Sequence, residues 1–158
     1  MRSKPRIVFD TNALISAAIL PNSVSNQALA IAVEHFAPIT SKEAWQEFAT
    51  RIQRPKLFHY FGTVPRRDDV VMGINRALTH INVQSVVTDC TDDPDDNKFL
   101  ALALDGEASI QITGDKHLLE LHPWRHVHMM RAGEFVRAHA EGVDLSARVN
   151  QLRKKPLS

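Results

Sequence analysis

Acidic side chains gather at particular points of this sequence. The stretch "TDCTDDPDDNKFLALAL" (88–104) is rich in aspartate, Asp96 included, before it becomes an apolar run. Asp10 ends the apolar stretch "RIVFD", Asp115 follows "ASIQIT", and Glu47 lies within "SKEAWQEF". Carboxylate oxygens, without cysteine or histidine, are the ligands that Mg²⁺ and Mn²⁺ prefer. Such an ion commonly polarises a phosphoryl oxygen and activates water. If these four acids converge, they predict metal-dependent chemistry on phosphate esters.

The elements that would position these acids alternate along the chain. Apolar, β-branched stretches predict strands, and apolar patterns with polar caps predict helices. Strands are expected at 6–10, 36–40, 83–87, 108–113 and 126–130, and helices at 11–20, 23–35, 41–55, 65–81, a segment ending at Gly106, 117–121 and 133–140. This alternation predicts an α/β fold with a parallel sheet covered by helices on both faces. We expect one domain over 1–140 and a polar, basic tail over 141–158.

The expected strand ends would bring the acids to one edge of the sheet. Asp10 follows the first strand, the helix that contains Glu47 follows the second, the aspartate-rich stretch follows the third, and Asp115 follows the fourth. In folds of this kind, ligands bind at the carboxyl ends of parallel strands. Four separate segments would therefore deliver carboxylates to one place.

Each acid also has a simpler explanation. Asp93 followed by Pro94 is a typical helix start, and acids in a first turn interact favourably with the helix dipole. Asp115 can cap the short helix that follows it, and Glu47 can pair with a basic residue four positions later. Asp10 is the hardest to explain in this way, because a charge buried at the end of a strand is unfavourable unless something compensates it.

Composition narrows the classes of protein. The chain has 158 residues, of which 44% are hydrophobic and 23% charged, which suits one ordinary domain with a core. No apolar run approaches the length of a membrane helix, and the N-terminus lacks the apolar region of a secretory signal. The single cysteine, Cys90, cannot form an internal disulfide. We therefore expect a cytoplasmic protein that does not insert into a membrane.

The chain resembles the PIN-domain family at four places. They are "FDTN" (9–12), "TSKEAWQEF" (40–48), "DPDDNKFLALAL" (93–104) and "ITGDKHLL" (112–119). Any one of these motifs is weak, but their order and spacing agree with the family from about residue 6 to residue 140. The chain is most similar to the bacterial branch described as toxins of toxin–antitoxin modules.

The resemblance implies a three-layer α/β/α sandwich and metal-dependent cleavage of single-stranded RNA with Mg²⁺ or Mn²⁺. It implies an RNA substrate, a cognate antitoxin protein as partner, and a homodimer. The catalytic and metal-binding acids would be Asp10, Glu47, Asp96 and Asp115, with Glu43 as a competitor of Glu47 for the second place. Polar neighbours that would hold the site are Thr11, Asn12, Asn97 and Thr113, and Asp93 would support the ligands. No acid that the family pattern requires is missing.

The segment "RIQRPKLFHYF" (51–61) mixes basic and aromatic residues. Arg51, Arg54 and Lys56 are expected to contact RNA phosphates. Aromatic side chains can also stack on bases, but Phe58 and Phe61 are more typical of a core. Four of the eight histidines lie close together in sequence, but His117, His122, His126 and His128 match no spacing that is typical of a zinc site.

Two other functions remain open on sequence alone. One is a phosphatase or phosphotransferase with Asp10 as the nucleophile, but this chemistry usually needs a second aspartate two residues later, where Asn12 stands. The other is a non-catalytic module that binds RNA or a protein partner. Activity with Mn²⁺ separates the nuclease from the binding module, and a phosphorylated Asp10 would identify the phosphatase.

Overall fold

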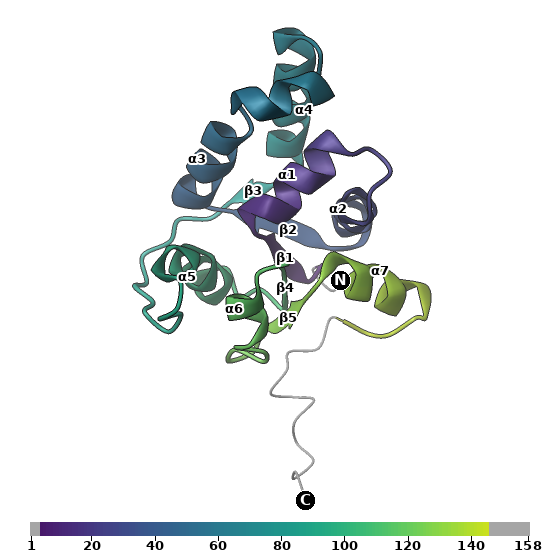
Figure 1. Ribbon diagram of the computed structural model, residues 1–158. Coiled ribbons are helices and arrows are strands. Elements are labelled where there is room, and N and C mark those ends of the chain that lie inside the picture. The colour runs from purple at the N-terminus through teal and green to yellow at the C-terminus, as the bar shows by residue number, and fades with distance from the viewer. Residues whose placement is uncertain (1–3, 146–158) are drawn as a thin grey trace, which may run out of the picture.

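A five-stranded parallel sheet forms the middle of the protein in a computed structural model, of which we describe residues 4–145 (Figure 1). The strand order is β3-β2-β1-β4-β5, and every neighbouring pair is parallel. The strands are β1 (Arg6–Phe9), β2 (Ala37–Thr40), β3 (Thr79–His80), β4 (Ile110–Ile112) and β5 (His128–Met130). Because β1 lies between β2 and β4, the segments that follow these three strands emerge side by side.

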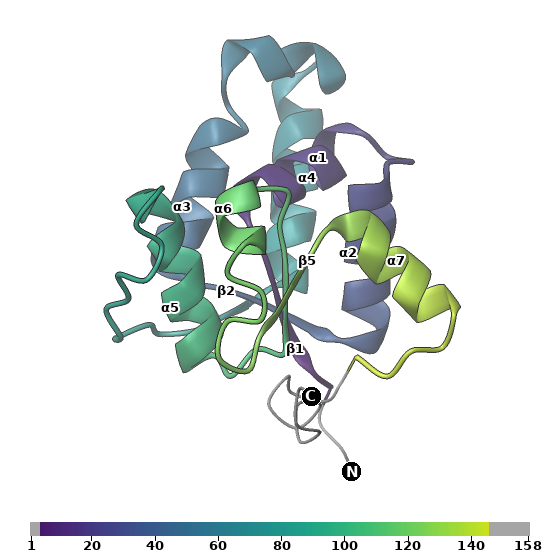
Figure 2. The same ribbon diagram turned by 60° about the horizontal axis from the view of Figure 1, so that its bottom comes forward.

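Helices cover both faces of this sheet, which confirms the expected three-layer α/β/α fold (Figures 1 and 2). The α-helices are α1 (Thr11–Ile19), α2 (Val24–His35), α3 (Lys42–Arg51), α4 (Val64–Ala77), α5 (Asn97–Asp105), α6 (Lys116–Leu119) and α7 (Ala132–Ala140). Two short 3₁₀-helices, η1 (Pro55–Tyr60) and η2 (Pro94–Asp96), precede α4 and α5. None of the described helices is by itself long and apolar enough to cross a bilayer, and α1 with α2 passes such a test only as a pair bent by 103°.

Alternation along the strands builds two apolar clusters, one on each face. Ile7 and Phe9 of β1 join the cluster under α1, α2 and α7, whereas Val8 joins the cluster under α5 and α6. Successive side chains of a strand point to opposite faces, so this division follows from the period of two. Leu145 is also buried in the first cluster, and the rest of the expected tail, 146–158, lies outside the described residues.

Serine caps fix the starts of two helices. Ser23 Oγ accepts a hydrogen bond from the backbone N–H of Asn26 at 3.1 Å, and Ser41 Oγ accepts one from Ala44 at 3.2 Å. Such caps satisfy N–H groups that have no partner within the helix. The Ser41 cap begins α3 directly after β2 and thereby places this helix at the carboxyl edge of the sheet.

The predicted strand at 83–87 is wrong. The third strand is β3, inside the segment expected to end the helix over 65–81, because α4 already ends at Ala77. The backbone N–H groups of Gln84 and Ser85 donate to Asp105 Oδ2 at 2.7 and 2.9 Å. The Asp105 side chain, at the end of α5, therefore accepts from N–H groups that would otherwise donate to a neighbouring strand. This apolar stretch is a loop and not a strand.

Gly106 allows the end of α5 to lie close to β2. A Cβ atom there would lie 2.3 Å from Ile39 Cδ1 and 2.9 Å from the carbonyl oxygen of Leu102. We expect Gly106→Ala to lower the free energy of unfolding by about 1–3 kcal/mol, as overpacking does, in urea denaturation. Gly73→Ala in α4 is the control, since nothing lies within 4 Å of the added carbon, and a helix favours alanine. Equal denaturation midpoints for the two variants would contradict this expectation.

Candidate metal centre

Asp10 directly follows β1 at the carboxyl edge of the sheet, and hydrogen bonds from two neighbouring segments hold its carboxylate. It is 5% exposed. Its Oδ1 accepts a hydrogen bond from the backbone N–H of Ala13 at 2.8 Å and so caps α1, and its Oδ2 accepts one from Thr113 Oγ1 at 2.6 Å. Burial raises the pKa of Asp10, the charges of Asp115 and Glu47 add to this, and the two hydrogen bonds oppose it. Thr113 follows β4, so the contact confirms that the ends of two adjacent strands meet here.

Three other aspartates meet beside this point. One carboxylate oxygen each of Asp93, Asp96 and Asp115 lies within 4.8 Å of the other two. Asp115 also caps α6, because its Oδ1 accepts from the N–H of His117 at 2.8 Å. Asp93 and Asp96 stand at the starts of η2 and α5, but neither side chain makes a capping hydrogen bond. The capping explanation therefore holds for Asp115 and fails for the other two side chains.

Asp96 carries the strongest electrostatic signal of the cluster. Its pKa is raised to about 8 by burial first, then by the hydrogen bond with Asp115 and the negative charges of Asp115, Asp93 and Asp10. Burial also acts to raise the pKa of Asp115, but the hydrogen bond from Asp96 and the N–H of His117 outweigh it and the pKa is lowered. Asp96 Oδ2 is buried without a hydrogen-bond partner. An uncompensated oxygen among like charges is what a bound cation would stabilise, so these residues fit a divalent ion.

Glu47 lies in the same region but already has cationic partners. Lys98 Nζ donates to its Oε2, and Arg51 Nη1 lies 3.4 Å from its Oε1. Burial would raise the pKa of Glu47, but the hydrogen bond from Lys98 and the positive charges of Lys98 and Arg51 lower it. Glu43, the competing acid, is exposed in the first turn of α3. The sequence did not predict that Lys98 pairs with Glu47. Its one signal was the position of this lysine, two residues after Asp96 in an acidic stretch.

The expected polar neighbours have separate roles. Asn97 joins α5 to the aspartate-rich loop, because its side chain donates to the carbonyl of Cys90 at 3.1 Å and accepts from the N–H of Cys90 at 2.8 Å. Thr113 also accepts from the N–H of Asp115 at 3.0 Å, so its hydroxyl links two of the acids. Thr11 is buried, whereas Asn12 is exposed.

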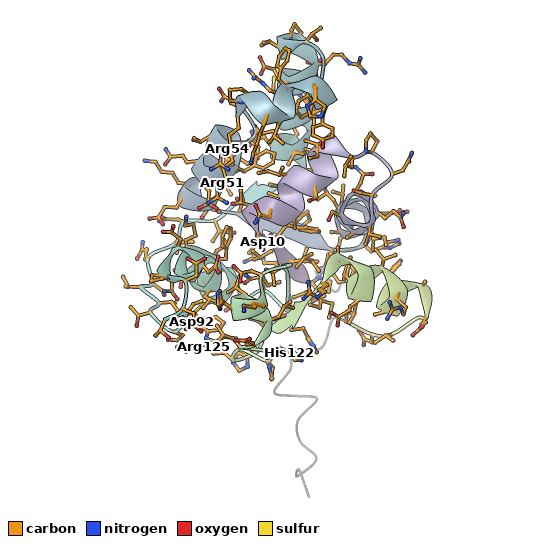
Figure 3. The ribbon with its side chains drawn as sticks, in the orientation of Figure 1. Asp10, Arg51, Arg54, Asp92, His122 and Arg125 are labelled. Atoms are coloured by element: carbon orange, nitrogen blue, oxygen red, sulfur yellow. The ribbon has the colours of Figure 1, made fainter. Side chains whose placement is uncertain are left out.

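The expected RNA-binding residues lie at the C-terminal end of α3 and just beyond it. In the view of Figure 3, Arg51 and Arg54 are labelled above Asp10. Arg51 is half-buried, while Arg54 and Lys56 are exposed. The prediction of two core phenylalanines in this segment is half right, because Phe61 is 5% exposed and Phe58 is 38% exposed. Phe58 stands on η1, which has no buried residue.

The four histidines between 117 and 128 lie near β5 and α6. His122 Nδ1 accepts a hydrogen bond from the N–H of Met129 at 3.0 Å, and the rings of His122 and His128 lie 5.8 Å apart. His117 Nδ1 lies 3.6 Å from Asp92 Oδ2, at the border of the acidic loop.

The fold is a parallel α/β/α sandwich with a group of aspartates at the carboxyl edge of its sheet. Comparisons with known proteins agree with this class of fold and site. The sequence profile of the PIN domain matches residues 6–117, so the chain belongs to the PIN-domain family. It is also 34% identical over 119 residues to an uncharacterized protein of Methanocaldococcus jannaschii, across 75% of this chain and 76% of that protein. The match to the PIN-domain profile spans the segments that carry Asp10, Glu47, Asp96 and Asp115. Nuclease-type activity is what this family suggests.

Proposed function

We propose that this protein is a metal-dependent endoribonuclease that cleaves single-stranded RNA. The observation that carries the proposal is the meeting of Asp10, Asp93, Asp96 and Asp115 at one edge of a PIN domain, where Asp96 Oδ2 is buried and unpartnered. Mg²⁺ or Mn²⁺ would supply polarisation of a phosphoryl oxygen and a lowered pKa of bound water when present.

The chain's own residues prepare the site in two ways. Thr113 fixes the carboxylate of Asp10 through a hydrogen bond of 2.6 Å, so this acid needs no rearrangement. Asp96 and Asp115 share a hydrogen bond, and the proton that Asp96 keeps must leave when a cation binds. Metal affinity should therefore increase as pH rises.

Product ends test the reaction type. Attack of water on phosphorus does not use the 2′-hydroxyl of RNA, so the products should carry 5′-phosphate and 3′-hydroxyl ends. Purified protein should cut a labelled single-stranded RNA with Mn²⁺, and EDTA should stop the reaction. A 2′-deoxy substitution at the cleaved position should leave the cut in place. Cleavage that persists in EDTA, or a 2′,3′-cyclic phosphate product, would overturn the proposal.

The exposed basic residues just past the end of α3 should hold the RNA backbone. We expect the double variant Arg54→Ala/Lys56→Ala to bind single-stranded RNA more weakly, because both exposed cations can neutralise phosphates. Each lost contact should reduce the slope of log affinity against log salt by about 0.7. Binding is best measured in an Asp96→Asn background, where the RNA is not cut.

Arg137→Ala is the matched control for this prediction. Arg137 is exposed on α7, away from α3 in Figure 1. This variant loses a positive charge but no expected phosphate contact, so its salt slope should equal that of the parent. If the double variant keeps the parent's slope, these two residues form an ordinary solvated surface.

The biological setting that we propose is a toxin–antitoxin module in the cytoplasm. The resemblance of the four motifs to the bacterial toxin branch supports this setting, and the family expectation of a homodimer goes with it. A small neighbouring gene whose product binds this protein and inhibits RNA cleavage would support the toxin role. A chain that cuts RNA but does not slow growth when expressed alone would contradict the toxin role. Light scattering would decide separately between monomer and dimer.

A further inference from the structure

Lys98 stands two residues after Asp96, yet its side chain binds Glu47 and not Asp96. Its Nζ donates to Glu47 Oε2 across 51 positions of sequence, from the first turn of α5 to the middle of α3. Both side chains are mostly buried, with 19% of Lys98 and 15% of Glu47 exposed. Arg51 Nη1 lies 3.4 Å from the other oxygen of Glu47. Each carboxylate oxygen of Glu47 therefore has its own cationic partner.

Asp96 of the centre lacks this compensation, because the charges that most affect its pKa are all negative. Asp96 Oδ2 has no hydrogen-bond partner, and the oxygens of Asp93, Asp96 and Asp115 approach one another within 4.8 Å. A divalent ion gains most where negative charge is least compensated. To reach Glu47, the ion would have to displace Lys98 and leave a partly buried ammonium group without its partner, which is strongly unfavourable.

We propose that Lys98 is a positioning residue that, together with Arg51, keeps Glu47 from ligating the metal ion. The centre then binds one divalent ion through its aspartates, and the ammonium group of Lys98 provides the second positive charge beside it. This inference rests on the metal centre of the proposed function and does not depend on RNA being the substrate.

The groove beside Lys98 provides a matched control. Lys98 also lines a groove of about 820 Å³ between α3, α5 and the loop after β3, along with Lys42, Ile81 and Ala101. Lys42 is exposed at the start of α3, on the wall of the same groove. Replacing Lys42 removes the same charge from the same groove without releasing Glu47.

Titration of the full chain with Mn²⁺ in a calorimeter, without RNA, tests the inference. We expect one Mn²⁺ per chain in the wild type. Glu47→Gln should keep this stoichiometry and change the affinity by less than about threefold, whereas Asp96→Asn should weaken it at least about tenfold. Lys98→Met should bind Mn²⁺ at least about tenfold more tightly, because it releases a carboxylate next to the site. Lys98→Arg should restore wild-type affinity, and Lys42→Met should resemble wild type.

A double-variant cycle shows whether Lys98 acts through Glu47. If it does, Glu47→Gln should cancel the gain produced by Lys98→Met. A Glu47→Gln variant that loses Mn²⁺ affinity at least about tenfold would overturn the inference, and so would a folded Lys98→Met variant with unchanged affinity. Should Lys98→Met fail to fold, Glu47→Gln decides alone.

Failure of the inference and failure of the proposed function give different results. A wild type that binds no Mn²⁺ overturns both. Metal binding as expected, without cleavage of any single-stranded RNA, overturns the nuclease and leaves the assignment of Lys98 intact. If the wild type cleaves RNA but Glu47→Gln loses metal affinity, the nuclease stands and the assignment of Lys98 is overturned.

Discussion

Asp96→Asn should abolish metal-dependent RNA cleavage and leave the fold intact. Asparagine keeps the shape of the side chain but removes the charge from the oxygen pair that meets Asp93 and Asp115. A catalytic ion contributes several kcal/mol to the transition state, and each 1.36 kcal/mol corresponds to about tenfold in rate. We therefore expect a loss of about a thousandfold or more, measured as the initial rate of RNA cleavage in Mn²⁺. Circular dichroism should match that of the wild type.

Asp95→Asn is the matched control, since it removes the same charge one position earlier. Asp95 is exposed and stands outside the group formed by Asp93, Asp96 and Asp115. Its variant should keep the wild-type rate within about threefold, because exposed charges are screened by solvent and salt. If Asp96→Asn keeps the wild-type rate in a preparation free of contaminating nuclease, the assignment of the centre is wrong.

The same experiments bear on the two functions that sequence left open. Asp10 is 5% exposed and both of its oxygens accept hydrogen bonds, from Ala13 and Thr113, so it is poorly placed to act as a nucleophile. A phosphatase would nevertheless show a phosphorylated Asp10 by mass spectrometry. A binding module would hold RNA without cutting it in Mn²⁺, and Asp96→Asn would then leave every measured activity unchanged.

Much of the fold follows from local patterns in the sequence. The apolar runs ending in Asp10 and Thr113 become β1 and β4, and the serine caps begin α2 and α3. These features depend on neighbouring residues, which sequence displays directly. The error at 83–87 has a different origin, because the hydrogen bonds from Gln84 and Ser85 go to Asp105, 21 and 20 positions away. No local pattern indicates that a side chain will bind these N–H groups.

Some features of the site also follow from local sequence, and others depend on contacts between distant segments. The order of strands was sufficient to bring Asp10 and Asp115 to one edge, because β1 and β4 are neighbours. Asp96 comes there from the start of α5 and not from the end of the strand expected at 83–87. The pairing of Glu47 with Lys98 depends on how α3 and α5 face each other, and a sequence separation of 51 residues gives no sign of it. Likewise, Phe58 and Phe61 look alike in sequence, yet η1 turns one outward and the other into the core.

The stability of the metal-free protein should depend on pH through Asp96. Burial, followed by Asp115, raises the pKa of Asp96 to about 8 in the folded state, whereas an unfolded aspartate has a pKa near 3.9. Between these values the folded chain holds a proton that the unfolded chain has released, so stability falls as pH rises. This contribution is fully present below about pH 4 and is lost as pH rises through about 8.

Asp96→Asn should remove this part of the pH dependence. At about pH 5 the wild-type carboxyl is protonated and resembles the amide, so the two proteins should melt at similar temperatures in EDTA. At about pH 8 the wild type carries uncompensated charge and the variant should melt higher, where about 1 kcal/mol corresponds to about 2–4 °C for a domain of this size. Mn²⁺ should stabilise the wild type by about 2.7 kcal/mol at a hundredfold excess over its dissociation constant, and the variant by less.

The opposite sign would identify Asp96 as an ordinary residue of a helix start. In that case the variant loses a favourable interaction with the helix dipole, typically about 0.3–1 kcal/mol, and melts lower than the wild type at about pH 8. It would also gain as much from Mn²⁺ as the wild type does. Thermal melts of both proteins at the two pH values, each with EDTA and with Mn²⁺, distinguish these outcomes. Because the raised pKa comes from burial and from Asp115 together, Asp115→Asn should flatten the pH dependence of the wild type in the same direction.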